Sequence, residues 1–179
     1  MNKSLSLTKY WLEHIIIGLD LCPFAQIPFK EGRIHVTVYE ESDEEGVIKS
    51  FTLECERLFI EGASKISTTL IAFPNFTQDF LEFNDFVGDL EYLLEEAGLS
   101  NVFQLVAFHP NFYFEGLKSN DLANYVNRSP YPVVHMIRVE EMKKAVDELK
   151  KGEQVSFFNE KKLKALSPEK IKELFYYLT

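Results

Sequence analysis

The sequence predicts an α/β fold: a sheet of about four strands, mostly parallel or mixed, with flanking helices and a helical C-terminus. Three apolar, strand-like segments start near residues 33, 68 and 103, and a helical pattern separates each from the next. This spacing is typical of right-handed βαβ crossovers and a parallel core sheet. A fourth apolar segment, 133–138, follows a long connection that contains no such helix.

The first half of the chain predicts alternating helices and strands. Residues 7–19 follow an amphipathic helical pattern. Residues 33–39 alternate between apolar and polar side chains, as in a strand with one buried face. Ser42 with Glu45 forms a capping box, which opens a helix that runs to about Glu61. The buried stripe of this helix is expected to be Val47, Phe51, Cys55 and Leu58.

The second half continues this alternation. Residues 68–73 (TTLIAF) form a more continuous apolar strand, as expected for the middle of a sheet that is covered on both faces. Thr77 is a suitable N-cap for the next helix, which ends near Gly98. A strand follows at 103–108. Beyond the fourth strand the pattern is helical, and Ser167 caps a helix with proline at its first position.

Composition limits the class of protein. At 179 residues, with 46% hydrophobic and 14% aromatic side chains, the chain predicts one ordered domain, 1–179, in which 139–179 is a helical extension packed on the rest. The two cysteines do not form a disulfide framework, which indicates a reducing compartment. The N-terminus lacks a signal-peptide pattern, and no apolar run approaches the roughly 18 residues of a membrane span. We therefore expect a cytoplasmic protein without a membrane partner.

Charge also limits the partners. The net charge is −9, and the segment 140–179 is near neutral, so the body carries nearly all of it. A protein that binds nucleic acid normally shows a basic stripe, and this chain has none, so nucleic acid is not expected as a partner. A small anion bound by one or two arginines remains a candidate ligand. The sequence does not indicate the oligomeric state.

The long connection within Leu105–Arg138 is the strongest indication of a site. Connections beyond about 12–15 residues are usually functional or disordered, and this one is too rich in aromatic residues and prolines for disorder. His109 begins it, at the carboxyl end of a predicted strand, where ligands bind in open α/β sheets. His109 suits a general base, a metal ligand or a turn histidine bonded to the backbone. The strand ends Leu70–Phe76 and Leu105–Phe112 have similar sequences, and the second adds His109.

Further candidates lie near the end of this connection. Arg128 could clamp a carboxylate or phosphate, or tie the connection to backbone carbonyls. Asn127 and Ser129 could orient a ligand or serve as turn residues. His135, within the fourth strand, is either a core histidine or a partner of His109.

Two candidates come from elsewhere in the chain. Cys22 precedes Pro23, and if that proline begins a helical turn, Cys22 lies at its N-cap, where the helix dipole lowers a thiol pKa. If the preceding helix runs on to Leu21, the dipole opposes the thiolate, and a buried structural thiol is the simpler interpretation. Asn84 is in line with the apolar positions of its helix, which predicts a buried polar residue that anchors the long connection or contacts a ligand.

The common catalytic and cofactor motifs are missing from the sequence. There is no glycine-rich phosphate loop, paired zinc-binding CxxC motif, HExxH or GxSxG element. A metal site would need His109, His135 and a carboxylate such as Asp121. Two histidines of unknown separation do not define one, so no metal ligand is assigned. The cofactor stays unknown.

Several motifs together resemble one protein family. They are Leu21–Ala25, Asp79–Phe86, Phe108–Pro110 and Asn127–Pro132 with His135. In this order they resemble the uncharacterised bacterial family known as domain of unknown function 1415. The resemblance runs from about Trp11 to Arg138, is least in the C-terminal helices, and implies a small cytoplasmic bacterial protein without an established activity. Similar proteins can have cysteine at the position of Tyr125, which weakens any scheme that needs a second thiol there.

Two hypotheses for the function follow. The first is an enzyme that acts on a small anionic metabolite, with Arg128 as anion clamp, His109 and His135 as acid and base, and Cys22 as an optional nucleophile. It requires the three basic side chains to converge in one pocket at an edge of the sheet. The second is a non-catalytic domain that binds a small ligand or another protein, with the aromatic residues of the long connection as contact area.

Overall fold

A computed structural model describes residues 2–148 and 155–178, and side chains except those of 148 and 155–158. Its centre is a four-stranded mixed sheet with the order β1-β2-β4-β3, formed by β1 (Ile34–Val38), β2 (Thr68–Ala72), β3 (Phe103–Phe108) and β4 (Val133–Arg138). β1 and β2 are parallel neighbours, whereas β4 lies between β2 and β3 and is antiparallel to both. The sheet is thus mixed, and the predicted parallel core is limited to the β1–β2 pair.

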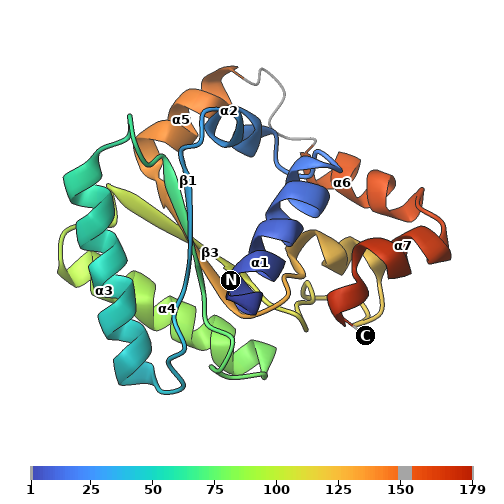
Figure 1. Cartoon of the computed structure of the whole chain (residues 1–179), viewed down its shortest axis with the longest axis horizontal. Coiled ribbons are helices and arrows are strands. Elements are labelled where there is room, and N and C mark those ends of the chain that lie inside the picture. The colour runs from blue at the N-terminus through green and yellow to red at the C-terminus, as the bar shows by residue number, and fades with distance from the viewer. Residues whose placement is uncertain (1, 149–154, 179) are drawn as a thin grey trace.

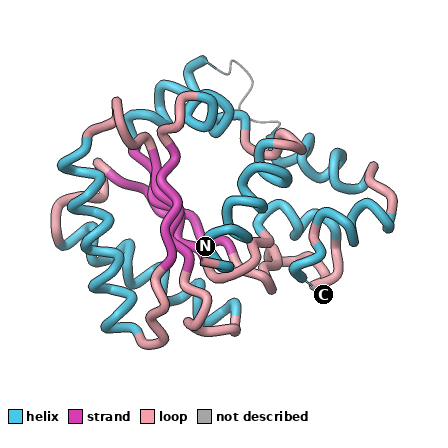
Figure 2. Tube along the Cα trace, in the orientation of Figure 1, coloured by secondary structure: helices cyan, strands magenta, loops and turns pink. Residues whose placement is uncertain are grey.

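Helices cover both faces of this sheet (Figure 1, Figure 2). On one face lie α3 (Glu44–Glu61) and α4 (Phe80–Glu96), the two crossover helices that the spacing of the strands predicts. Their buried side chains form one core with the sheet residues Ile71, Phe103 and Met136, among others. The buried stripe predicted for α3 is confirmed: Val47, Phe51, Cys55 and Leu58 all belong to this core.

The other face carries the N-terminal and C-terminal helices. The chain starts with α1 (Lys3–Tyr10) and continues as the π-helical segment η1 (Trp11–Ile17), followed by η2 (Pro23–Ala25) and α2 (Gln26–Lys30). After β4 come α5 (Val139–Glu148), α6 (Val155–Lys164), α7 (Pro168–Leu174) and η5 (Tyr176–Leu178). Apolar side chains of η1, α6 and α7 form a second core with the sheet, so two distant parts of the sequence share this layer. Part of the predicted helical extension, 149–154, lies outside the described residues.

The caps of α3 and α4 lie one or two residues after the predicted ones, and the first helix starts at Lys3 rather than at residue 7. Asp43, not Ser42, caps α3 by accepting a hydrogen bond from Gly46 N–H, and Asp79, not Thr77, caps α4. In both caps the residue is an aspartate, and a carboxylate is the stronger acceptor at the positive end of a helix. Ser167 caps α7 as predicted, with Pro168 at its first position.

The long connection between β3 and β4 is ordered and packed. It contains the short helix η3 (Leu122–Asn127), and α6 lies against this helix. The Tyr125 ring meets the Phe175 ring edge to face at 4.9 Å. The aromatic side chains of this connection mostly contact one another and the helices, as in the pairs Phe80–Phe112 and Phe112–Phe114. Phe112 is buried among them, whereas Phe114 is exposed.

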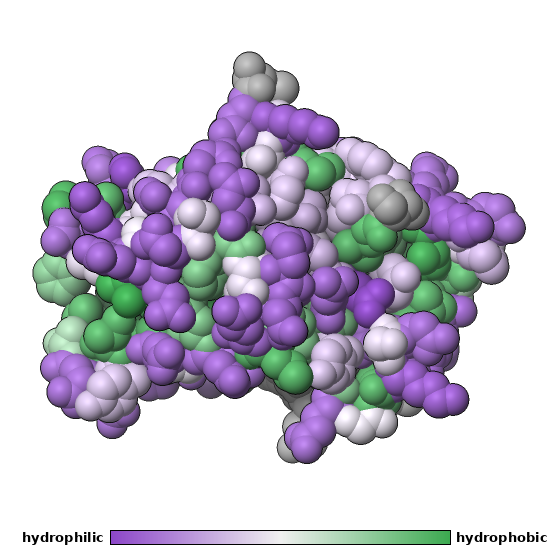
Figure 3. All heavy atoms as spheres, turned by 90° about the horizontal axis from the view of Figure 1, so that it is seen from below, coloured by the Kyte–Doolittle hydropathy of each residue, from purple (hydrophilic) through white to green (hydrophobic). Residues whose placement is uncertain are grey.

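Apolar side chains reach the surface elsewhere. Figure 3 shows hydrophobic side chains toward the end of the molecule that α3 and α4 occupy. On α3, Leu53, Phe59 and Ile60 are exposed. Among the helices that the structure describes, none combines the length and apolar character needed to cross a membrane.

Candidate functional site

A cavity of about 660 Å³ lies on the sheet face that carries the N-terminal helices. Its walls come from η1, from the segment leading into η2, from α2 and α5, and from side chains of all four strands on that face. Ligand pockets typically measure about 300–1,000 Å³ and are mostly apolar with a few polar groups. This cavity has that character. Its apolar lining includes Trp11, Leu12, Ile16, Leu21, Phe24, Leu70, Val106, Phe108 and Ile137.

Irregular backbone positions the N-terminal wall. In the π-helical segment, Gly18 N–H donates to Glu13 O and Leu21 N–H to Ile16 O, both five residues back. Asp20 then adopts a positive φ of 51°, which ends the segment and turns the chain toward Cys22. Asn159 of α6 donates to Leu21 O at 2.7 Å in a buried contact. The C-terminal region thus fixes the segment that carries Cys22.

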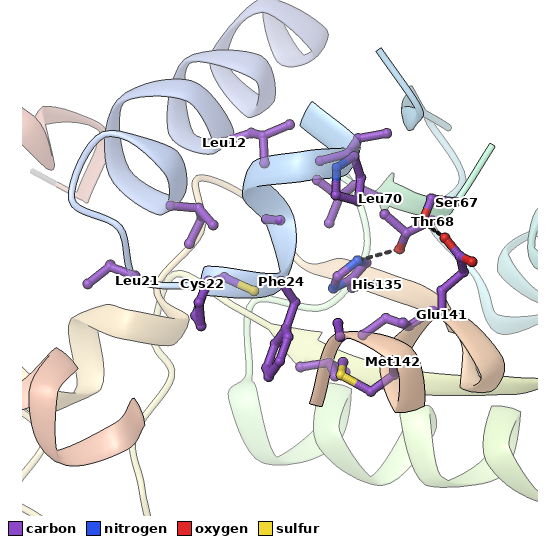
Figure 4. A pocket seen from close by; sticks show the side chains of 18 of the residues that line it. Leu12, Leu21, Cys22, Phe24, Ser67, Thr68, Leu70, His135, Glu141 and Met142 are labelled. Carbon is purple, nitrogen blue, oxygen red and sulfur yellow. Dashed lines mark hydrogen bonds between the residues drawn. The ribbon is translucent and has the colours of Figure 1, made fainter. Parts of the chain in front are cut away.

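His135 projects from β4 into this cavity (Figure 4). In the sheet it lies opposite Leu70 of β2 and Val106 of β3. Its Nε2 lies 2.6 Å from Thr68 Oγ1, and its Nδ1 has no hydrogen-bond partner among the described residues. Among the described residues, the fully enclosed polar side-chain atoms without a partner are Trp11 Nε1 and Thr69 Oγ1. Nδ1 of His135 lacks a partner but is not one of them, so it retains accessible surface, which faces the cavity. Burial lowers the pKa of His135 to about 4, so the ring is neutral at neutral pH.

Charged side chains gather at one end of the cavity, and they are paired. Arg33, just before β1, contacts Glu31 at 2.7 Å and Glu141 of α5 at 3.1 Å. Lys144 contacts Glu140 at 3.0 Å. Burial raises the pKa of Glu141, but hydrogen bonds from Arg33 and from Ser67 outweigh it and hold that pKa below its usual value. Among the described residues, both cations that line the cavity therefore already have carboxylate partners.

Cys22 lines the same cavity as His135. It is the residue before the helical turn η2, which realises the N-cap arrangement that the sequence left open. Burial is the largest influence on the thiol and raises its pKa, although the Ala25 and Phe24 backbone N–H groups act in the opposite direction. The dipole of so short a turn does not overcome desolvation. At neutral pH the side chain is a thiol.

His109 lies in different surroundings. Its side chain is fully buried and packs against the rings of Phe80 and Phe83 of α4, on the other side of the sheet. Asn111 N–H donates to Nδ1 at 3.0 Å, and Nε2 donates to Thr77 O at 3.3 Å. Both ring nitrogens are thus used within the fold, as expected of a turn histidine, and burial lowers the pKa of the ring.

The similar strand ends Leu70–Phe76 and Leu105–Phe112 explain the structural role of His109. Phe76 N–H donates to Phe73 O after β2, and Phe112 N–H donates to His109 O after β3. The two Pro-Asn-Phe sequences therefore form the same turn, and His109 occupies in the second turn the place of Phe73 in the first. Both side chains are fully buried. The similarity that singled out His109 is a repeated structural turn.

Arg128 is also used internally. Its Nε donates to Phe112 O at 3.1 Å, Nη2 donates to Ser119 O at 2.5 Å, and the guanidinium lies 4.7 Å from the centre of the Tyr125 ring. These contacts tie the long connection together. His109, Arg128 and His135 do not converge in one pocket, contrary to the expectation from the sequence.

Of the remaining predicted residues, one lines the cavity and the others lie outside it. Asn127 lines the cavity, and its carbonyl accepts the His109 N–H. Ser129 is buried and donates to Tyr131 O within its turn. Asn84 is exposed rather than buried, because the apolar stripe of α4 passes through Phe83 instead. Asp121 caps η3. The described residues contain no group of three or more histidine, cysteine or acidic side chains that could hold a metal ion.

Several cavity residues were missed from the sequence. Ser67, Thr68 and Thr69 precede the apolar end of β2, and this run of hydroxyl residues was the available signal. Arg33 and Glu141 come together only because α5 follows β4 back toward the start of β1. A single sequence does not reveal that pairing.

The fold and the cavity together define a class: an α/β domain with a mixed sheet and one apolar, histidine-containing cavity on a sheet face. The chain belongs to the family described as protein of unknown function (DUF1415), whose model matches residues 3–173. The match includes most of the C-terminal helices, beyond the range expected from the motifs. Searches of curated proteins and of solved structures found no match.

Proposed function

We propose that this protein binds a small, uncharged and mostly apolar molecule in the cavity between the sheet and the N-terminal helices, with His135 as its polar recognition group. The observation that carries the proposal is an apolar cavity of about 660 Å³ with the unpartnered imidazole nitrogen of His135 at its wall. Recognition through one polar contact within an apolar enclosure is typical of small-molecule sites.

The charges favour an uncharged ligand over an anion. An anion would need a cation that is free to pair with it, and Arg33 and Lys144 already contact carboxylates. Arg128, the expected anion clamp, donates to backbone carbonyls outside the cavity lining. Moving a charge into such surroundings without a partner is costly. Binding of an anionic ligand is therefore the alternative result of the binding test described next.

Three naphthalene derivatives of similar size test the proposal. They are 2-naphthol, which is uncharged at neutral pH, 2-methoxynaphthalene, and the anion 2-naphthoate. We expect the uncharged probes to raise the melting temperature in a saturable way, and 2-naphthoate to bind more weakly. Tighter binding of 2-naphthoate would reject the uncharged ligand, and no binding of any probe would count against the cavity as a site.

A matched pair of variants locates the binding. Val106 lies beside His135 on the cavity wall, so Val106→Phe fills part of the space. Leu81→Phe adds an aromatic ring at an exposed position of α4, on the opposite side of the sheet, and serves as control. We expect Val106→Phe to weaken 2-naphthol binding about tenfold or more, equal to about 1.4 kcal/mol, while Leu81→Phe leaves it unchanged. Equal affinities in both variants would place the probe elsewhere.

A catalytic use of the cavity is the second candidate, because Cys22 and His135 both line it. A thiol with a raised pKa needs a base, and the neutral imidazole of His135 lines the same cavity, although burial makes it a weak base. Attack of the Cys22 sulfur on p-nitrophenyl acetate would release p-nitrophenolate and leave an acetyl group on the sulfur. Mass spectrometry of wild type, Cys22→Ser and His135→Phe would detect that adduct. Acetylation of Cys22 that requires His135 supports catalysis, and its absence supports binding alone.

A further inference from the structure

The hydrogen bonds around Thr68 determine where the proton of His135 lies. Thr68 Oγ1 is 2.7 Å from Met136 O and 2.6 Å from His135 Nε2. Two oxygens at 2.7 Å require a hydrogen between them, and a carbonyl oxygen carries none, so Thr68 donates to Met136 O. The hydroxyl has only one hydrogen. Toward His135 it must therefore accept, and Nε2 carries the ring proton.

We infer that Thr68 is a positioning residue: it fixes His135 as the Nε2–H tautomer, so that Nδ1 offers a lone pair to the cavity and selects a ligand with a hydroxyl or N–H donor. The part about the ligand rests on the function proposed above. The part about the tautomer concerns the unliganded protein and stands on its own.

The strand register holds Thr68 in this role. Leu70 pairs with His135 and Thr68 pairs with Ile137, so Thr68 is the diagonal neighbour of His135 on the same face (Figure 4). A β-branched side chain has few χ1 rotamers, and only 8% of Thr68 is exposed, so the hydroxyl has little freedom to reorient. The hydrogen of the Thr68 hydroxyl is donated to the Met136 carbonyl of β4.

The surroundings keep Nδ1 free of a proton. Charged groups near the cavity come from the segment before β1 (Arg33) and from α5 (Glu141 and Lys144), and Cys22 is the titratable group of the η2 segment. The Glu141 carboxylate is occupied by Arg33 and Ser67, and no hydrogen bond links it to His135. Desolvation disfavours the imidazolium form. An anion or an acceptor-only ligand would thus place a lone pair against the lone pair of Nδ1.

The tautomer can be read directly by NMR of the ¹⁵N-labelled protein without ligand. Long-range couplings between ring nitrogens and carbon-bound protons distinguish protonated from unprotonated nitrogens in each histidine. We expect a protonated Nε2 and an unprotonated Nδ1 for His135 at neutral pH. A protonated Nδ1 would overturn the inference without any bearing on whether the cavity binds a ligand.

Two variants show whether Thr68 is responsible. Thr68→Ser keeps the hydroxyl and should keep the wild-type nitrogen shifts of His135. Thr68→Val has the same shape without the hydroxyl, and we expect it to lose the pure Nε2–H signature. If Thr68→Val shows the wild-type pattern, the tautomer has another cause. The wild-type spectrum decides the tautomer even if Thr68→Val does not fold.

The donor requirement is tested with 2-naphthol and 2-methoxynaphthalene, which differ by replacement of the hydroxyl hydrogen with a methyl group. A net hydrogen bond in a protein corresponds to about a threefold to tenfold preference, so we expect wild type to favour 2-naphthol by that factor. His135→Phe should remove the preference while both probes still bind. Equal affinity of the two probes for wild type would reject the donor requirement yet leave the proposed binding function intact.

Discussion

His109 and His135 lie in the same small sheet but meet opposite surroundings. His109 follows β3, is fully buried against α4, and has a partner at each ring nitrogen. His135 lies in the neighbouring strand β4, faces the cavity, and has a partner at Nε2 alone. Both rings carry their proton on Nε2 and both are neutral at neutral pH. They differ in whether Nδ1 already has a hydrogen-bond partner.

This difference separates a structural histidine from a candidate recognition residue. A backbone N–H satisfies Nδ1 of His109, so replacing that ring damages the turn. In His135 the same atom is left to the cavity, so replacing the ring removes a polar group from the wall. The location of a histidine at a strand end is thus less informative than the partner of its second nitrogen.

The largest predicted effect is on stability, through His109→Ala. The substitution removes a fully buried ring and leaves Asn111 N–H and Thr77 O without their partners. We expect a loss of about 3 kcal/mol in the free energy of unfolding, measured with urea. His109→Phe keeps the volume, as Phe73 does in the related turn, and should cost less. Binding of 2-naphthol should persist in both variants, and its selective loss in a stable His109 variant would contradict the assigned role.

The next effect concerns pH and His135. Its pKa is about 4 in the folded state and about 6.5 when unfolded, so between these values the unfolded chain binds more protons. This contribution to stability is present above the unfolded pKa and is lost as the pH falls toward 4. The expected loss attributable to His135 is about 2 kcal/mol between pH 7 and pH 5.

His135→Phe isolates this contribution, because His109 and the carboxylates still titrate in the variant. Urea unfolding of wild type and variant at both pH values gives the difference. Glu141, whose pKa is held below its usual value, is present in both proteins, so its titration cancels in the difference. An identical pH dependence in the two proteins would mean that His135 has an ordinary pKa and is not enclosed as described.

Local patterns in the sequence were sufficient for the elements of the fold. The four strands, the buried stripe of α3 and the cap at Ser167 follow from periodicity and capping chemistry, which act over a few residues. The insertion of β4 between β2 and β3 could not be predicted, because strand order depends on which edges pair in three dimensions. The crossover helices α3 and α4 were predicted from the spacing of the strands, whereas the positions of α6 and α7 depend on contacts between distant segments.

The site was predicted only in part, for the same reason. Cys22, Asn127 and His135 do line the cavity, but Thr68, Arg33 and Glu141 become relevant through contacts between distant segments. Asn84 was misplaced because it and Phe83 lie on adjacent positions of α4, and a shift of one residue on a helix turns a side chain outward by about 100°. The charge of Arg128 suggested a ligand, while the backbone carbonyls that it binds were not visible in the sequence.

Arg128→Met tests whether this arginine, which lies outside the cavity, has a structural role or binds an anion. The variant loses hydrogen bonds to Phe112 O and Ser119 O and the stacking on Tyr125, so we expect a destabilisation of about 2 kcal/mol. Arg128→Lys keeps the charge without the forked geometry and should be destabilised nearly as much. Affinity for 2-naphthol and 2-naphthoate should not change in either. A selective loss of 2-naphthoate binding in Arg128→Met that Arg128→Lys restores would reinstate the anion clamp.

The smallest effect is on the reactivity of the two thiols. Burial raises the pKa of Cys22, and it raises that of Cys55 to about 12. Iodoacetamide should therefore modify Cys22 more slowly than a free thiol, and Cys55 more slowly still. Mass spectrometry of Cys55→Ala and Cys22→Ala measures each rate separately.

Ligand binding extends this measurement to the cavity. Because Cys22 lines the cavity and Cys55 lies in the core on the other face, saturating 2-naphthol should slow the modification of Cys22 alone. Modification of Cys22 faster than that of a free thiol would show a thiolate at neutral pH. Since desolvation opposes a thiolate, such a rate would favour the catalytic candidate, in which His135 takes up the thiol proton.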